Sequence, residues 1–134
     1  RDVPIMAIER TNPSSLGQPS GYHHVVKDGK TVYLAGQVAR DRDGKTVGVG
    51  DAAAQAEQVF RNIQAALESV GSDLGHILKM TTFMTHREDF PAYRAARSKF
   101  LTDDDALPAS TLILCSGLAD PDFRIEIEAV AAIP

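Results

Sequence analysis

Two short stretches of the sequence carry residue types that could take part in catalysis. Ser110 stands in "PAST" (108–111), directly before the apolar run "LILC", and Glu126 and Glu128 stand in "RIEIEAVAAI" (124–133). A serine becomes a strong nucleophile in a Gly-x-Ser-x-Gly turn, which Ser110 lacks. The two glutamates lie two residues apart on a predicted strand and therefore share one face. That face is either a solvated outer surface or the border of a groove between subunits, and the spacing alone leaves both interpretations open.

The spacing of the histidines does not favour a metal site. His23 and His24 are adjacent, and adjacent side chains of a strand point to opposite faces, so they cannot bind one metal ion together. His76 and His86 stand alone, without a cysteine or histidine at ligand spacing. We therefore expect polar or half-buried histidines and no metal.

The composition limits the partners of the chain. With 134 residues, the natural expectation is one domain spanning residues 1–134. The net charge of −4 offers no basic field to a phosphate backbone or to anionic lipid, so neither nucleic acid nor membrane is an expected partner. Cys115 is the only cysteine and cannot form an internal disulfide. Residues 1–10 lack a signal-peptide core, and no apolar run approaches the roughly 20 residues of a membrane span, so we expect a cytoplasmic protein.

The residue pattern predicts two helices and five strands. Apolar residues recur at helical spacing between Asp51, the expected N-cap, and Gly71, the expected stop. A second helix is expected after the cap Asp89, with Pro91 in its first turn and Phe90 on its inner face. The expected strands flank the turn "KDGK" and continue in "HILKMTTFMTH", "STLILCSG" and "RIEIEAVAAI".

The predicted sheet has one face that the helices do not cover. Two helices can pack on one face of such a sheet in an α+β fold. The runs "TVYLAGQVA" and "TLILCSG" are apolar at odd and even positions alike, so the second face should also be dry. No remaining element can cover it. Self-association through the sheet is the economical solution, and grooves between subunits would then be natural binding sites.

Several segments, read in order, resemble the Rid family, the YjgF-like reactive-intermediate deaminases. They are "GY" (21–22), "VYLAGQVARD" (32–41), "GDAAAQAEQVFRNIQAALESVG" (50–71), "DLGHILKMTTFMT" (73–85), "LPAST" (107–111) and "IEIEAVA" (125–131). The resemblance implies a chorismate-mutase-like α+β fold, a mixed β-sheet with two helices packed on one face. It also implies a homotrimer whose sheets line a central β-barrel, with three small-molecule clefts between subunits.

The resemblance further implies a chemistry and the residues that perform it. Active members hydrolyse imines or enamines to carbonyl compounds and ammonia without a metal or an organic cofactor. Glu126 matches the glutamate that holds the attacking water and is the expected catalytic residue, because a carboxylate can orient water and accept its proton. Tyr22 matches the cleft tyrosine, and Gly36 matches the glycine whose backbone approaches the ligand. Ala35 stands where a serine is common, so a hydroxyl is missing there.

Two further positions of the expected substrate-binding set depart from the deaminating branch of the family. Ser110 stands where that branch carries an arginine that grips the substrate carboxylate. A guanidinium offers two parallel charged donors, whereas a serine offers one neutral donor with a shorter reach, so Ser110 cannot replace it. Arg94 stands where asparagine is often found. It either supplies a displaced positive charge or is an ordinary surface arginine.

These residues predict a hydrolytic imine or enamine deaminase of a divergent branch, whose substrate is not a simple 2-imino acid. The alternative is a trimer of the same fold that binds a small molecule without catalysis, because the missing clamp removes much of the anchoring on which positioning depends. RNA cleavage has also been attached to the family. The acidic charge balance and the lack of a basic patch interleaved with aromatic residues disfavour it.

Overall fold

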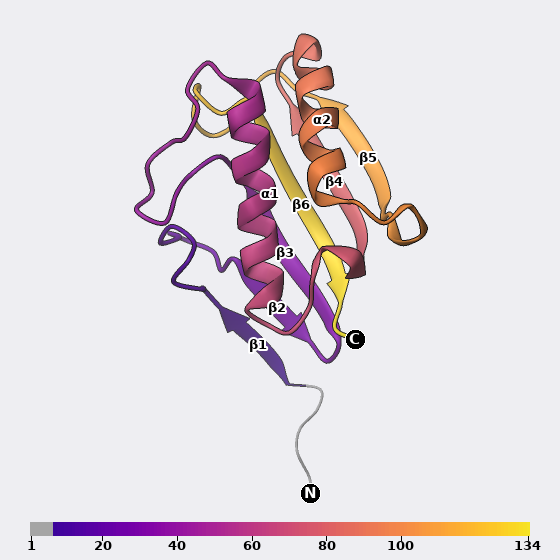
Figure 1. The fold of residues 1–134 in the computed structure, drawn as a ribbon. Coiled ribbons are helices and arrows are strands. Elements are labelled where there is room, and N and C mark those ends of the chain that lie inside the picture. Colours follow the sequence, from indigo (N-terminus) through magenta and orange to yellow (C-terminus); the bar gives the residue numbers. More distant parts are fainter. Residues whose placement is uncertain (1–6) are drawn as a thin grey trace, which may run out of the picture.

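The computed structural model describes residues 7–134 as one six-stranded sheet with two helices on one of its faces (Figure 1). Residues 1–6 lie outside the described residues, so the predictions that include them, namely a single domain over residues 1–134 and the expectation of no signal peptide, concern a start that is not described. The strands are β1 (Ile8–Thr11), β2 (Val25–Asp28), β3 (Thr31–Gln37), β4 (Ile77–Met84), β5 (Ala109–Leu114) and β6 (Ile125–Ala132), and the helices are α1 (Ala52–Glu68) and α2 (Phe90–Phe100). Short 3-10 turns span Leu74–His76, Arg87–Asp89 and Asp104–Ala106. Neither helix of the described part is long and apolar enough to cross a membrane.

The sheet is mixed, with the strand order β1-β2-β3-β6-β4-β5. β2 and β3 form the predicted hairpin, with Asp28 opposite Thr31 across the turn. β3 and β4 both pair antiparallel with β6, while β4 pairs in parallel with β5. The α+β prediction is therefore confirmed, but β1 is a sixth strand that the sequence did not predict. All four of its residues are exposed, so no apolar alternation marks it.

α1 forms where the sequence predicts the first helix. The Asp51 carboxylate accepts a hydrogen bond of 3.1 Å from the backbone N–H of Ala54 and so caps the first turn. The apolar stripe of the helix faces the sheet, and Phe60 and Leu67 are fully buried. The chain leaves the helix through Gly71, whose φ of +83° lies in the left-handed region that glycine adopts without strain.

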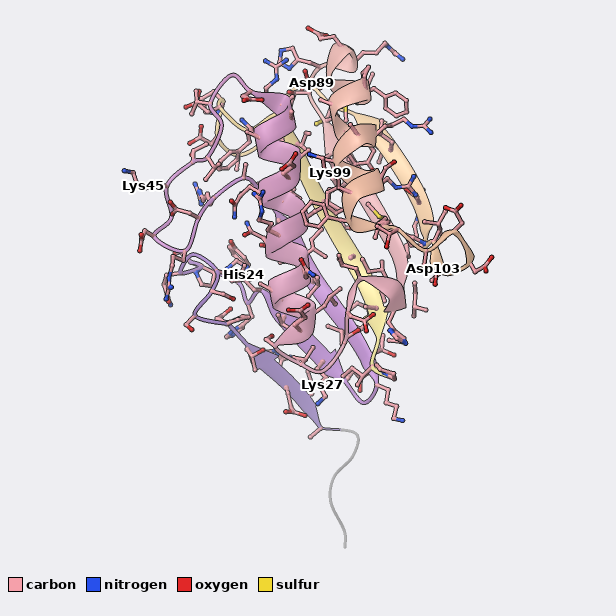
Figure 2. All side chains as sticks on the ribbon, in the orientation of Figure 1. His24, Lys27, Lys45, Asp89, Lys99 and Asp103 are labelled. Carbon is pink, nitrogen blue, oxygen red and sulfur yellow. The ribbon has the colours of Figure 1, made fainter. Side chains whose placement is uncertain are left out.

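α2 lies beside α1 on the same face of the sheet (Figure 1). Lys99 of α2 donates a hydrogen bond of 2.7 Å to the Glu57 carboxylate of α1 (Figure 2). Phe60 and Phe100 stack between the helices with their ring centroids 5.5 Å apart. The two helices thus form one layer over the sheet.

The start of α2 departs from the prediction. The predicted cap, Asp89, makes no capping hydrogen bond with its side chain. Its carboxylate instead accepts two hydrogen bonds from Arg124, at 2.7 Å from Nε and 2.9 Å from Nη2. The prediction that Phe90 faces inward is wrong, since it is 39% exposed and its ring lies under the guanidinium of Arg94. A local pattern could not reveal Arg124, which is 35 positions away in sequence, whereas Arg94 is the i+4 neighbour of Phe90 on the surface of the same helix.

The helices leave the other face of the sheet open. On the helix side, residues such as Met80 and Ile127 are buried, at 1% and 0% exposure. The opposite face presents Tyr33, which is 49% exposed. β5 is an exposed edge strand in the single chain rather than a buried one, with Ile113 and Leu114 at 40% and 38% exposure. Apolar side chains on this face and this edge therefore lack a partner within the described chain.

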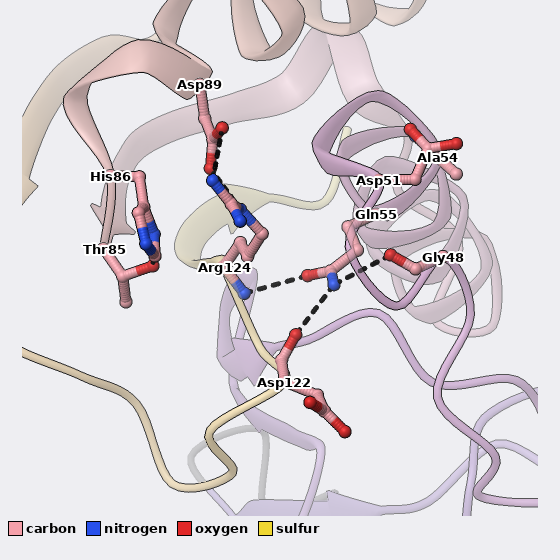
Figure 3. A network of polar contacts seen from close by, with 9 residues as sticks. All are labelled: Gly48, Asp51, Ala54, Gln55, Thr85, His86, Asp89, Asp122 and Arg124. Atoms are coloured by element: carbon pink, nitrogen blue, oxygen red, sulfur yellow. Dashed lines mark hydrogen bonds and ion pairs between the residues drawn. The ribbon is translucent and has the colours of Figure 1, made fainter.

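Gln55 of α1 holds the loop that leads into β6 (Figure 3). Its Nε2 donates to the carbonyl oxygens of Gly48 at 3.1 Å and Asp122 at 2.8 Å, and its Oε1 accepts from the backbone N–H of Arg124 at 2.9 Å. The side chain is fully buried. Because these bonds flank Phe123, one amide fixes both that ring and the start of β6.

Replacement of Gln55 should destabilise the protein. Gln55→Leu keeps a similar volume but leaves the three backbone partners of the amide unpaired, and each buried unpaired group costs about 1–3 kcal/mol. After relaxation we expect the free energy of unfolding, measured with urea, to fall by about 2–4 kcal/mol. Gln64→Leu, at a half-buried position of the same helix, is the control. An equal loss in both variants would show that the Gln55 network contributes nothing special.

Candidate active site

A hollow of about 360 Å³ lies where β3 and β6 meet the loop that precedes β6. It is lined by Tyr22, Ala35, Gly36, Val38, Arg40, Ala119, Phe123 and Glu126. Four of the six predicted site residues, namely Tyr22, Ala35, Gly36 and Glu126, therefore come together in one chain. The volume suits a small molecule.

Glu126 projects into the hollow above a break in the pairing of β3. β6 alternates, so that Ile127 is buried toward the helices while Glu126 points to the other face. The register of β3 against β6 shifts between Leu34 and Gln37, and Gly36 lies in this β-bulge. A Cβ added to Gly36 would lie 2.8 Å from Cδ of Glu126 and closer still to Oε2. The carboxylate can therefore occupy this position only beside glycine, and with a larger residue the end of the Glu126 side chain would have to move.

The environment of Glu126 makes its carboxylate a better proton acceptor than a solvated one. Burial raises the pKa of Glu126 above the ordinary value of 4.5, and the neighbouring Glu128 carboxylate raises it further. A carboxylate with a higher pKa holds a proton more tightly and accepts it more readily. The geometry and the electrostatics thus agree with the role of general base.

His24 (labelled in Figure 2) is a buried side chain that contacts Tyr22 and Gln37 behind the hollow. It is 6% exposed, and its Nε2–H donates to the carbonyl oxygen of Gly17 at 2.7 Å. Because a carbonyl oxygen can only accept, Nδ1 is the free acceptor and receives the Nε2–H of Gln37 at 3.1 Å. Gln37 also donates to the carbonyl oxygen of Ala35 at 3.1 Å. The rings of Tyr22 and His24 are nearly perpendicular, with their centroids 5.6 Å apart. The predicted polar histidine is therefore a support for two site residues, which the sequence alone did not show.

Arg40 and Phe123 are lining residues that the sequence did not single out. The guanidinium carbon of Arg40 lies 4.9 Å from the centroid of the Phe123 ring. The signal available was an arginine four residues after Gly36 in "AGQVARD". Phe123 lies in a loop whose position depends on Gln55, far away in sequence, so no local pattern could have located it.

The remaining two predicted residues, Ser110 and Arg94, lie away from this hollow. Ser110 is exposed on β5 and shares a face with Leu112, which packs against the core on the helix side. Glu126 projects from the other face. Arg94 is exposed on α2, where its guanidinium carbon lies 5.6 Å from the centroid of the Phe90 ring. Neither residue lines the hollow of its own chain.

The described residues do not assemble a metal-binding cluster. Within residues 7–134, no group of three or more histidine, cysteine, aspartate or glutamate side chains could hold a metal ion. His76 instead contacts the Asp73 carboxylate through Nδ1 at 2.7 Å, and this contact lowers the pKa of Asp73. These side chains form local surface pairs.

Comparison with known proteins identifies the family. The family model described as Endoribonuclease L-PSP matches residues 13–133. The chain belongs to this family, that of the YjgF, RutC and Rid proteins. The resemblance found in the sequence is thereby confirmed.

Curated relatives from the family cover most of the chain. A 2-iminobutanoate/2-iminopropanoate deaminase of Salmonella typhimurium is 35% identical over 121 residues, covering 89% of this chain and 90% of the relative. Protein DfrA of Myxococcus xanthus is 32% identical over 119 residues, covering 89% and 88%.

Solved structures of other proteins share the fold of this chain. The YjgF gene product of E. coli has a TM-score of 0.85 and 29% identity, with 94% of this chain and 99% of that chain covered. E. coli TdcF with bound serine has a TM-score of 0.84 and 26% identity, with 92% and 98% covered. The chorismate-mutase-like fold implied by the sequence is confirmed.

The contact between Gly36 and Glu126 leads to a prediction about a pKa. In Gly36→Ala the new Cβ should push the flexible end of Glu126 toward solvent, so that the pKa of Glu126 falls toward 4.5 while the fold persists. NMR titration of the glutamate carboxyl carbons measures this change. Gly117→Ala is the control, because a Cβ there meets no atom within 4 Å. An unchanged pKa of Glu126 in Gly36→Ala would contradict the described packing.

Proposed function

We propose that the chain forms a homotrimer and hydrolyses an imine or enamine in clefts between the subunits. Assembly is supported by the exposed apolar side chains of the open face and of β5, with Tyr33 at 49% and Ile113 at 40% exposure. The reaction class is supported by relatives named 2-iminobutanoate/2-iminopropanoate deaminase. The observation that carries the proposal is the half-buried Glu126 carboxylate above Gly36, in a hollow of small-molecule size.

In this proposal Glu126 is the general base of the hydrolysis. It holds a water molecule against the imine carbon and takes a proton from it as the C–O bond forms, while the C=N π electrons move to nitrogen. Glu126 returns that proton to the nitrogen, which gives a carbinolamine. In the second step Glu126 moves the hydroxyl proton to the nitrogen. The C–N bond then breaks, and a carbonyl compound and ammonia leave.

A neighbouring subunit would have to bring Ser110 to the cleft. Within one chain Ser110 lies on the edge strand β5, away from the hollow. A serine at position 110 offers one neutral hydrogen-bond donor, whereas an arginine there would offer two parallel charged donors, and Ala35 offers no hydroxyl. We therefore expect the substrate to be an imine or enamine other than a simple 2-imino acid.

A second candidate is binding of a small molecule without turnover. Ser110 favours this candidate, because a weaker anchor reduces the positioning on which catalysis depends. RNA cleavage, which the family description names, gains less support from the chain itself. Its net charge of −4 provides no attraction for a phosphate backbone.

Glu126→Gln tests the hydrolytic proposal. The variant keeps the size of the side chain but cannot accept a proton, so hydrolysis of the fastest imine should fall by about 10²–10⁴-fold. Rates are measured by semicarbazide trapping, with imines generated in situ that differ in the position of their charge. The kcat/KM of the parent should fall as the pH decreases through the raised pKa of Glu126, because the protonated acid is no longer a base.

Glu128→Gln is the matched control for this experiment. It removes an equal charge from the same face of β6 and should retain most of the activity. Turnover by Glu126→Gln at the parental rate would exclude the base role. A parent protein that accelerates no imine but binds keto acids would establish the second candidate instead.

A further inference from the structure

Arg40 is a cation in the hollow to which the mechanism above assigns no role. It lines the same cavity as Gly36 and Glu126. Arg40 is exposed, the ion pairs described for residues 7–134 involve other side chains, and its guanidinium lies over the ring of Phe123. Its charge is therefore available to a ligand.

The structure holds the backbone of Arg40 in a defined place, and an aromatic ring supports its exposed side chain. Its carbonyl oxygen accepts a hydrogen bond of 2.9 Å from Nδ2 of Asn62, and its N–H donates to the carbonyl oxygen of Val38 at 2.8 Å. A β-bridge also pairs Arg40 with Thr46. The guanidinium carbon lies 4.9 Å from the ring centroid of Phe123, which is 2% exposed. An arginine over an aromatic face gains cation–π attraction while its N–H donors remain free for a planar anion.

Arg40 and Glu126 share the hollow without neutralising each other. A guanidinium paired with Glu126 would lower the pKa of that carboxyl, whereas burial and Glu128 raise it. The hollow thus offers a proton acceptor on one wall and an unpaired cation on another. A ligand with a negative group can satisfy the cation while its reactive carbon faces the carboxylate.

We infer that Arg40 binds an anionic group of the substrate and so replaces the cation that Ser110 does not provide. The inference rests on the proposed function for the substrate class, and it adds a carboxylate or a similar planar anion to the imine or enamine. Arg40 comes from the same chain as Glu126, whereas Ser110 would come from a neighbour. The anion-binding charge is therefore supplied by the chain that carries Glu126.

Arg94 is the competing source of positive charge. Its guanidinium lies over the ring of Phe90 on the outside of α2, and it does not line the hollow of its own chain. Arg40 is the better candidate because it shares one hollow with Glu126 without any contribution from a second chain. The two residues make different predictions for variants, so one experiment separates them.

Binding of keto acids tests the inference without requiring turnover. Keto acids are the hydrolysis products of imino acids, and we use pyruvate and 4-oxopentanoate as charged probes and 2-pentanone as the neutral one. Calorimetric titration of the full chain should show that at least one keto acid binds more tightly than 2-pentanone. Arg40→Gln should weaken the binding of that keto acid by about 10- to 150-fold, the effect expected from loss of a charge-assisted hydrogen bond. Arg40→Lys keeps the charge but not the two parallel donors, so its affinity for the keto acid should lie between those of the parent and of Arg40→Gln.

Arg42→Gln is the matched control, since it removes the same charge from an exposed position of the same loop outside the hollow. It should bind the keto acid as the parent does. The inference is overturned if the parent prefers neither keto acid to the ketone, if the preference survives Arg40→Gln, or if only Arg94→Gln abolishes it. A failure of the proposed hydrolysis would be seen separately, as unchanged turnover in Glu126→Gln, because keto-acid binding does not require a proton acceptor.

Discussion

The helices cover only one face of the sheet, and this constraint shapes the rest of the molecule. On the covered side the strands and α1 form a continuous apolar core, including Phe60, Met80 and Ile127. On the open side Tyr33 of β3 is 49% exposed, and Glu126 projects from the neighbouring strand β6 farther along the same face, next to Gly36. A carboxylate can therefore stand on the sheet without entering the core. The same open face provides the apolar surface on which the proposed assembly rests.

The site is built on supports that lie behind it. Gln55 holds the loop around Phe123, and the guanidinium of Arg40 packs over the Phe123 ring. On the other wall, the bond from Gln37 to His24 fixes the β-bulge that contains Gly36. Rigid supports of this kind place polar groups without relying on flexible loops. The geometry of the hollow therefore depends on buried residues that lie behind it.

The position of Glu126 carries a cost in stability. Because burial raises its pKa in the folded chain, the folded state binds a proton more readily than the unfolded state. The contribution of this group to stability is complete below pH 4.5 and is lost as the pH rises through the raised pKa. A solvated carboxylate would avoid this loss at neutral pH. The cost is consistent with a residue retained for chemistry rather than for folding.

The sequence revealed the elements with strong periodicity and the residues within short motifs. α1 was predictable because its cap, apolar stripe and terminal glycine all agree, and Gly36 and Glu126 were located by motif. β1 was not predictable, since its exposed residues carry no apolar alternation. The prediction that Asp89 caps α2 is wrong, because its carboxylate accepts hydrogen bonds from Arg124, which is 35 positions away. Phe123 was not predictable for the same reason, because its position depends on Gln55, which is distant in sequence.

The central claim is that copies of this chain cover the open face and complete the cleft around Glu126. Size-exclusion chromatography with multi-angle light scattering at micromolar concentration tests it most directly. The account predicts a species of three times the 14.4 kDa chain mass. A stable monomer of 14.4 kDa under the same conditions would contradict it, because Ser110 would then have no neighbouring cleft to enter.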